Sequence, residues 1–177
     1  MPSTSAEELV DITDDAGTVI GITTRQEMRL RRLPHRCTYI LVFNRHGNLF
    51  VHQRTANKDV NPSFWDVCVG GVSAACESFD DGARRELLEE LGVEAVPEPL
   101  FPFRYADDRT IVHAMVYRVI HDGPFHFQPE EVARGEFVSV AELNRWFAER
   151  MFCPDGVDVW REFARRAKVA CERPATV

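Results

Sequence analysis

Residues 70–93 of this chain read GGVSAACESFDDGARRELLEELGV, and this stretch indicates the fold around it. The two glycines end an apolar, β-branched run, which predicts a strand that stops near residue 71. A helix is expected over residues 79–91, because Ser78 can cap its first turn. Gly92 can take the left-handed conformation that commonly ends a helix. The stretch therefore predicts a strand, a glycine turn and a helix in succession.

Three glutamates lie on this helix where stability alone would not place them. On a wheel of about 100° per residue, one arc of roughly 120° is apolar and contains Phe79, Ala83, Leu87 and Leu91. Glu90 falls inside that arc, Glu86 lies about 20° beyond its edge, and Glu89 lies further round. Charge near a packed face is costly, and Arg84 and Arg85 offset only part of it. The clustered carboxylate oxygens therefore suit a hard divalent cation such as Mg²⁺.

The alternative for this helix is an acidic face that is exposed to water and balanced by nearby Lys or Arg. The helix alone favours this alternative, since most runs of glutamate are solvated. The preceding Gly70 and Gly71 favour a ligand site instead. Glycine has no side chain, so it lets backbone amides and carbonyls approach a ligand closely.

The composition of the whole chain limits the classes of protein to which it can belong. With 177 residues, 45% of them hydrophobic and 28% charged, the chain is expected to form one domain over residues 1–177. The net charge of −7 argues against broad nucleic-acid binding, and no apolar run is long enough to span a membrane. The acidic N-terminus lacks the order of a signal peptide, and residues 1–7 are expected to be disordered. The scattered cysteines, with no C-x-x-C pair, indicate free thiols and a cytoplasmic protein.

The flanking segments complete an α+β pattern. Residues 9–32 predict a hairpin followed by a short helix. Further strands are expected at 37–43, 49–54, 64–71, 99–105, 110–120 and 136–140, and two helices over 140–150 and 155–171. This order predicts one α+β domain in which a mixed sheet carries helices on both faces.

The spacing of the central stretch resembles a known family. Gly71, Glu77 and the run RELLEELGV over residues 85–93 match the Nudix box at every defined position. A match at fixed spacing over such a length is far more specific than a lone glycine motif. The resemblance implies a Nudix-type α/β/α sandwich with a mixed β-sheet. It also implies a hydrolase that uses Mg²⁺ or Mn²⁺ to cleave a diphosphate linkage in a nucleoside diphosphate derivative or a similar compound.

The same resemblance implies roles for the residues of the box. The expected metal ligands are Glu86, Glu90, Glu89 and the carbonyl oxygen of Gly70. Arg85 would orient the carboxylates, and Glu77 would join that network. The reaction is attack of water on phosphorus, with a general base that takes the proton. The base stays open among Glu86, Glu89 and a glutamate outside the box, for which Glu130 and Glu131 are the candidates and a solvated loop is the alternative.

Arg54, Lys58 and Glu131 are candidates for substrate binding. The first two flank the site in related sequences, and an ordinary surface charge is the alternative for each. The implied partner is a small-molecule diphosphate, with no nucleic acid and no membrane, and a homodimer is left open. Specificity is expected to come from loops 55–63, 104–110 and 121–135, but these carry no diagnostic motif, so the sequence does not identify the compound.

Residues 9–140 are also similar to the Nudix subgroup related to isopentenyl diphosphate isomerase, in runs such as LPHRCTYILVF and FWDVCVGG. An isomerase is therefore an alternative function. That isomerase has a cysteine before the box glycine and a histidine after it, where this chain has Gly70 and Val72, and Cys68 lies two residues too early. His35 matches a metal histidine of the isomerase, although a single histidine at a strand start is more commonly structural. A non-catalytic Nudix ligand-binding module is the second alternative, and the complete set of box glutamates argues against it.

Overall fold

The computed structural model describes residues 6–172. Its strands are β1 (Leu9–Thr13), β2 (Val19–Thr24), β3 (His35–Phe43), β4 (Leu49–Arg54), β5 (Trp65–Asp66), β6 (Glu98–Ala106), β7 (Ile111–Ile120) and β8 (Val132–Val138). Its helices are α1 (Arg25–Leu30), α2 (Phe79–Leu91), α3 (Val140–Glu149) and α4 (Pro154–Glu172). The hairpin and short helix expected over residues 9–32 are therefore present as β1, β2 and α1.

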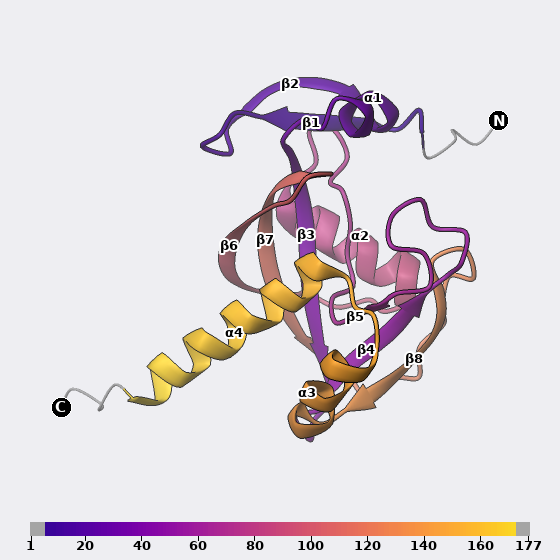
Figure 1. Ribbon diagram of the computed structural model, residues 1–177, viewed down its shortest axis with the longest axis vertical. Helices are drawn as coiled ribbons and strands as arrows, with labels where there is room; N and C mark the ends of the chain where they lie inside the picture. Colours follow the sequence, from indigo (N-terminus) through magenta and orange to yellow (C-terminus); the bar gives the residue numbers. More distant parts are fainter. Residues whose placement is uncertain (1–5, 173–177) are drawn as a thin grey trace.

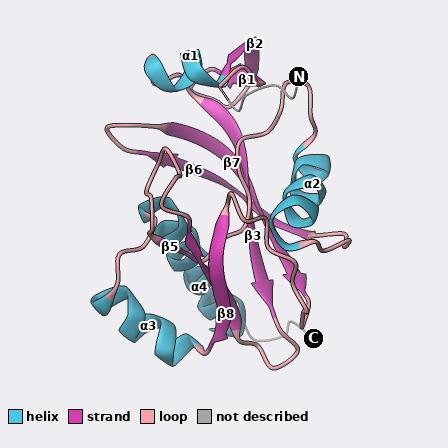
Figure 2. Ribbon diagram, turned by 90° about the vertical axis from the view of Figure 1, so that its right-hand side faces the viewer, coloured by secondary structure: helices cyan, strands magenta, loops and turns pink. Residues whose placement is uncertain are grey.

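Strand β3 is the centre of the sheet, as Figures 1 and 2 show. It pairs with β7 in parallel along its whole length, from His35 opposite Val112 to Phe43 opposite Ile120. Its apolar, β-branched sequence suits a strand that is buried on both faces. β6 pairs antiparallel with β7, whereas β4 meets β3 only at Phe43 and then pairs with β5 and β8. The sheet is therefore mixed, as the sequence predicts.

Helices cover both faces of this sheet. Alternate residues of β3 point to opposite faces, as they do in any strand. Ile40 lies in one hydrophobic core with Leu87 of α2, and Leu41 lies in a second core with Trp146 of α3 and Val159 of α4. Figure 2 shows α2 on one side of the sheet and α3 and α4 on the other. The expected sandwich of helices around a mixed sheet is confirmed.

Residues 64–71, expected as one continuous strand, form a short strand followed by a bent segment. β5 pairs with β4 only through Trp65–Asp66, and the chain then meets β3 at an isolated bridge between Val69 and Ile40. Gly70 has a positive φ of 138°, a backbone conformation that a regular strand does not contain. The prediction of a continuous strand was wrong, because the chain changes its partner from β4 to β3 after Asp66, and apolar character does not reveal which strand a residue pairs with.

The strand expected at 136–140 begins and ends earlier in the structure. β8 starts at Val132 because it pairs with the whole of β4, from Leu49 opposite Val138 to Arg54 opposite Val132. It stops before Ser139, whose hydroxyl accepts a hydrogen bond from a backbone N–H in the first turn of α3. This N-cap converts the end of the expected strand into the start of a helix.

Both ends of the chain extend beyond the described residues. The disorder expected for residues 1–7 falls mostly on residues 1–5, outside the described residues. Residues 6–7 form a turn, in which the carbonyl oxygen of Ala6 accepts a hydrogen bond from Gln26 N–H at 3.1 Å. The free thiols expected from the sequence are present at Cys37, Cys68, Cys76 and Cys153. Among the helices of residues 6–172, none is long and apolar enough to cross a membrane.

Candidate active site

Helix α2 presents its glutamates as the sequence predicts. Ser78 caps the first turn, and Gly92 ends the helix in the left-handed conformation with a φ of 66°. Glu86 and Glu90 are only 9% and 6% exposed, whereas Glu89 is exposed. Two carboxylates of this helix are therefore buried on the side that packs toward the sheet.

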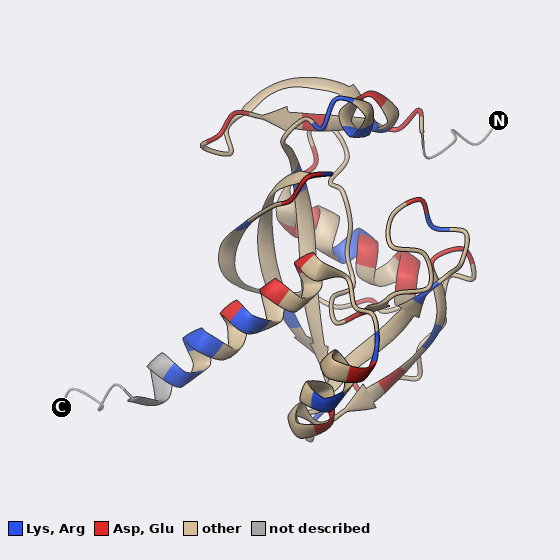
Figure 3. Cartoon of the chain, viewed as in Figure 1, with Lys and Arg blue, Asp and Glu red and all other residues tan. Residues whose placement is uncertain are grey.

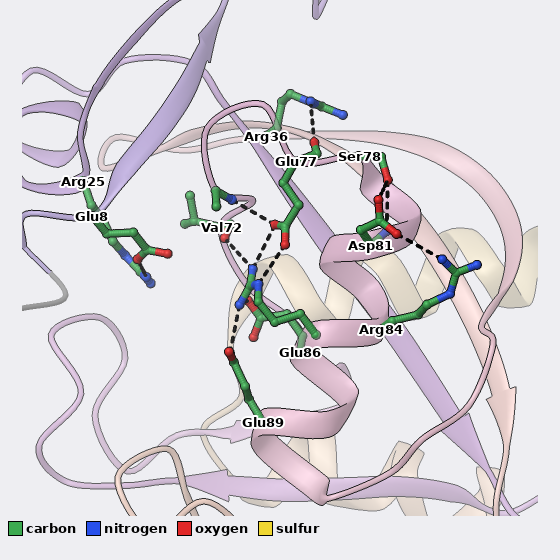
Figure 4. Close-up of polar contacts among 12 residues, drawn as sticks. Glu8, Arg25, Arg36, Val72, Glu77, Ser78, Asp81, Arg84, Glu86 and Glu89 are labelled. Carbon is green, nitrogen blue, oxygen red and sulfur yellow. Dashed lines mark hydrogen bonds and ion pairs between the residues drawn. The ribbon is translucent and has the colours of Figure 1, made fainter. Parts of the chain in front are cut away.

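Arg85 is the centre of an ion-pair network, which Figure 4 shows. Its guanidinium donates to both carboxylate oxygens of Glu77 at 2.8 and 3.0 Å, to Glu86 at 3.0 Å and to Glu89 at 2.8 Å. The hydrogen bonds with Glu77 raise the pKa of Arg85. Partial burial acts to raise the pKa of Glu77, but the hydrogen bonds from Arg85 outweigh it and lower that pKa. Arg85 therefore holds three carboxylates of the candidate site in fixed positions.

Gly70 and Gly71 bring the backbone close to the buried carboxylates. Gly70 N–H donates to Glu90 Oε1 at 3.4 Å. A Cβ on Gly71 would lie 2.9 Å from Glu86 Oε1, and a Cβ on Gly70 would lie 2.2 Å from the carbonyl oxygen of Thr38. The position of Gly70 therefore admits no side chain. Within the described chain the carbonyl oxygen of Gly70 accepts no hydrogen bond, which leaves it open to a ligand.

The electrostatics of the two buried glutamates show a deficit of positive charge. Burial raises the pKa of Glu86 to about 7, although Arg85 acts in the opposite direction. Burial, together with the negative charge of Glu86, raises the pKa of Glu90 well above its usual range. Both shifts mean that the surroundings do not balance two ionised carboxylates. A cation bound between them would remove this deficit.

The available donors fit a hard divalent cation. Glu86, Glu90 and the carbonyl oxygen of Gly70 offer only oxygen ligands, which Mg²⁺ and Mn²⁺ prefer. Within residues 6–172, no three His, Cys, Asp or Glu side chains lie close enough together to enclose a metal ion. The guanidinium of Arg85 instead bonds Glu86 and Glu89 through the same nitrogen. Coordination by Glu89 would therefore require this carboxylate to turn away from Arg85.

Lys58 and Glu131, expected as substrate-binding residues, lie together near the carboxylate cluster. The Lys58 ammonium forms an ion pair with Glu131 Oε2, and the charges of both residues act on Glu90. Glu130 is exposed, so Glu131 is the glutamate of this loop that the structure brings to the site. The charges of Glu90 and Glu131 also act on Arg54, whose guanidinium donates to a backbone carbonyl oxygen of the adjacent loop at 3.1 and 3.3 Å.

A cavity of about 320 Å³ adjoins the two glycines. It lies among α1, loop 55–63, the turn between β6 and β7, and the start of α4. Its basic lining residues are Arg25, Arg29, Arg32, Arg54, Lys58 and Arg109. Loops 55–63 and 104–110, expected to carry specificity, both contribute to its lining. This concentration of positive charge suits phosphate groups.

Three arginines in and just beyond α1 were missed by the sequence analysis. Arg25, Arg29 and Arg32 recur at the spacing i, i+4, i+7, which is a helical period and could have indicated a basic face. Figure 3 shows this basic segment at α1, above the sheet. Arg25 forms an ion pair with Glu8, and Arg29 forms one with Asp59. Arg32 donates to the carbonyl oxygen of Asp107.

His35 and Cys68, which bear on the isomerase alternative, are buried residues that line the cavity. His35 Nδ1 lies 3.0 Å from the carbonyl oxygen of Leu33. Burial lowers the pKa of His35 to about 4, so its ring is neutral at neutral pH. Burial also raises the pKa of Cys68, so its thiol stays protonated. Both therefore have the surroundings of packing residues.

The fold and the site together define an α/β/α-sandwich protein with an acidic, oxygen-rich centre beside a basic cavity. A family model described as the NUDIX domain matches residues 33–155. The chain belongs to the Nudix family.

Relatives and solved structures agree with this assignment. The chain is 42% identical over 160 residues to an uncharacterized Nudix hydrolase of Streptomyces coelicolor, and the alignment covers 88% of each chain. It is similar to the crystal structure of a Deinococcus radiodurans protein, with a TM-score of 0.74, 26% identity, and coverage of 88% of this chain and 98% of that one. The NUDIX domain of Shewanella oneidensis NrtR, complexed with ADP ribose, has the same fold, with a TM-score of 0.62, 16% identity, and coverage of 82% and 99%.

Proposed function

We propose that this protein is a Nudix hydrolase that uses Mg²⁺ or Mn²⁺ to cleave a diphosphate linkage in a nucleoside diphosphate derivative or a similar compound. One observation carries the proposal. Glu86 and Glu90 are buried together against Gly70 and Gly71, at the edge of a cavity lined by cationic side chains. Family membership and the relative in Streptomyces coelicolor support a hydrolase acting on pyrophosphate bonds.

The residues of the site have different proposed roles in this reaction. A bound divalent cation supplies charge neutralisation for the phosphates and lowers the pKa of a water molecule. Glu86, Glu90 and the carbonyl oxygen of Gly70 would hold that cation. Arg85 fixes the orientation of Glu86 through a hydrogen bond of 3.0 Å. Lys58, at the edge of the cavity, would bind a phosphate oxygen through a charged hydrogen bond.

Glu89 is the proposed proton acceptor. Its side chain is exposed, and its carboxylate accepts a hydrogen bond from Arg85 at 2.8 Å. It can therefore contact water without a prior movement out of the protein interior. Glu131 is less suited to this role because its side chain is less exposed, 31% against 48% for Glu89, and because it comes from the loop before β8 and not from α2. A general base must come within hydrogen-bond distance of the proton that it removes, and an exposed glutamate on the same helix as the metal ligands meets that condition.

An isomerase is the alternative reaction, since residues 9–140 are similar to the isomerase-related subgroup. The structure gives an observation against it. A cysteine at the position of Gly70 would place its Cβ 2.2 Å from the carbonyl oxygen of Thr38, so the backbone excludes that side chain. Cys68, the nearest thiol in sequence, is buried and has a raised pKa. A non-catalytic binding module is the other alternative, and the complete set of box glutamates favours the enzyme.

We further propose a single domain over residues 1–177 and a cytoplasmic location, the latter supported by the free thiols. A small-molecule diphosphate is the proposed partner. For a homodimer, β2 offers an exposed apolar surface at Ile20 and Ile22.

Hydrolysis by the purified full chain should depend completely on Mg²⁺ or Mn²⁺. The test incubates the protein with nucleoside diphosphates, dinucleotides, nucleotide sugars, ADP ribose and isopentenyl diphosphate, and measures the products with metal and with excess chelator. We expect at least one compound to be cleaved with metal and none with chelator, because Glu86 and Glu90 cannot bind phosphates without a cation. No dimethylallyl diphosphate should form from isopentenyl diphosphate. Full activity in excess chelator would falsify the metal assignment, and isomerisation in place of hydrolysis would overturn the proposed reaction.

A further inference from the structure

One buried hydroxyl group near the candidate metal ligands is not used by the fold. Thr38 lies in the middle of β3, and 0% of its surface is exposed. Its Oγ1 finds no hydrogen-bond partner among the described residues. A buried hydroxyl without a partner destabilises a protein, and a valine would fill nearly the same volume without that cost. Packing alone therefore does not explain a threonine at this position.

The side chain of Thr38 faces helix α2. Residues two apart on a strand point to the same face of the sheet. Ile40, two residues after Thr38, lies in the core that contains Leu87 of α2. A Cβ on Gly82, at the end of the first turn of α2, would lie 3.5 Å from Thr38 Cγ2. The methyl group of Thr38 therefore packs against the helix that carries the metal-binding glutamates.

The hydroxyl of Thr38 lies beside the two glycines of the candidate site. A Cβ on Gly70 would lie 3.4 Å from Thr38 Oγ1, and the N–H of Thr38 donates to the carbonyl oxygen of Gly71 at 2.9 Å. The Glu86 carboxylate borders the same glycines, because a Cβ on Gly71 would lie 2.9 Å from its Oε1 and 3.3 Å from its Oε2. Thr38 from β3 and Glu86 from α2 therefore reach the same short segment of backbone.

Of the two buried glutamates, Glu86 is the closer to Thr38 along the helix. Glu86 follows Gly82 by four residues, so the two lie one turn apart on the same face. Glu90 follows Gly82 by eight residues, which is roughly 12 Å along the helix axis. An ionised carboxylate offers about four acceptor positions, and the hydrogen bond from Arg85 at 3.0 Å uses one of them, on Glu86 Oε1. Acceptor positions therefore remain for a cation and for a second donor.

We propose that Thr38 is a positioning residue, whose hydroxyl donates a hydrogen bond to the Glu86 carboxylate when the divalent cation is bound. This inference rests on the proposed function, because it takes Glu86 to be a ligand of that cation. A cation shared by Glu86, Glu90 and the carbonyl oxygen of Gly70 draws the Glu86 carboxylate toward Gly70, where the Thr38 hydroxyl lies. Hydrogen bonds from such outer groups fix the orientation of metal-binding carboxylates.

Two substitutions at this position separate the hydroxyl from the methyl group. Thr38→Val should weaken Mn²⁺ binding to the full chain ~10-fold, as loss of an outer hydrogen bond to a metal ligand typically does. Its Tm in chelator should equal or exceed that of the parent, because the hydroxyl has no partner without the cation. Thr38→Ser keeps the hydroxyl and should keep the Mn²⁺ affinity, but its Tm should fall because the methyl group that packs against α2 is lost. Affinity is measured from the free-ion signal in electron paramagnetic resonance.

Thr13→Val is the matched control. Thr13 in β1 is also buried, and its Oγ1 also has no partner among the described residues. Its backbone N–H donates to Pro34, which precedes Thr38 by four residues, or roughly 13 Å of extended chain. Thr13→Val should therefore leave the Mn²⁺ affinity unchanged. A double-mutant cycle tests the route of the effect: in a Glu86→Gln background, Thr38→Val should cause no further loss, because the two residues act together.

Each outcome decides the inference. Unchanged Mn²⁺ affinity in Thr38→Val, with weaker binding in Glu86→Gln, overturns it and leaves the proposed function intact, whereas unchanged affinity in Glu86→Gln overturns both. An equal loss of affinity in Thr38→Ser or Thr13→Val contradicts a specific role of the Thr38 hydroxyl. A lowered Tm of Thr38→Val in chelator also contradicts it, since the hydroxyl would then stabilise the metal-free fold. Additive losses in the cycle would show that Thr38 does not act through Glu86.

Discussion

Replacing Glu90 by Gln is expected to lower kcat for hydrolysis by at least ~10²-fold, and Glu86→Gln should have an effect of the same size. The amide keeps the shape of the carboxylate but removes the charge that would hold the metal ion. Both side chains are buried beside Gly70 and Gly71, so the loss acts at the site itself. The measurement is steady-state kinetics with Mg²⁺ on the compound that the parent protein cleaves fastest.

Both glutamine variants should fold normally. Burial raises the pKa of Glu86 and of Glu90, so a neutral side chain at either position removes an electrostatic cost from the metal-free protein. Thermal unfolding in chelator should therefore show a Tm equal to or above that of the parent. Glu94→Gln is the matched control, since Glu94 is an exposed glutamate just beyond the helix and should leave kcat unchanged. Near-normal turnover in both Glu86→Gln and Glu90→Gln would place the active site elsewhere.

Arg85→Ala is expected to lower the free energy of unfolding by about 2–4 kcal/mol, because removing one partner of a buried ion pair leaves the other charge without compensation. Arg85 bonds Glu77, Glu86 and Glu89, and the first two are largely buried. Arg85→Lys should recover only part of this loss, since an ammonium cannot make the paired hydrogen bonds that the guanidinium makes with Glu77. Denaturant unfolding in chelator at neutral pH measures the difference.

The neighbouring arginine provides the control for this prediction. Arg84 points away from the network and pairs with Asp81 at 3.0 Å, on the surface. Arg84→Ala should therefore change stability by less than about 0.5 kcal/mol. The cost of Arg85→Ala should also shrink at acid pH. Arg85 lowers the pKa of Glu77, so the stability that this pair contributes is present above the unfolded pKa of about 4.3 and is lost as pH falls through the folded value. Equal stability of Arg85→Ala and the parent at neutral pH would contradict the proposed role of the network.

The part of the site that lies on one helix could be predicted from the sequence. Helical periodicity alone places Glu90 within the apolar arc and Glu86 at its edge, and both are buried in the structure. The caps at Ser78 and Gly92 also follow from local chemistry, because each depends on residues within one turn. These features need no information about distant segments.

The cavity could not be predicted, because it is assembled from segments that meet only in the folded chain. Asp66 and Asp155 are far apart in sequence, and each appears there as an ordinary polar residue. Both line this cavity, and Gly156 lets the first turn of α4 approach Asp66, since a Cβ there would lie 2.4 Å from Asp66 Oδ1. Likewise, the helical spacing of Arg25 and Arg29 indicates a basic face but not the cavity that it borders. The strand is interrupted after β5 because the chain changes its partner from β4 at Asp66 to β3 at Val69, and no hydrophobic pattern encodes that change.

The most direct test of the proposed metal site measures the affinity for Mn²⁺ of the parent and of the variants Glu86→Gln, Glu90→Gln and Glu94→Gln. Binding is detected as the loss of the free-ion signal in electron paramagnetic resonance. We predict that the parent and Glu94→Gln bind Mn²⁺ with the same affinity, and that each of the other two binds it at least ~10-fold more weakly, because a ligand charge has been removed. Unchanged Mn²⁺ affinity in both Glu86→Gln and Glu90→Gln would contradict the claim that these buried carboxylates form the metal site.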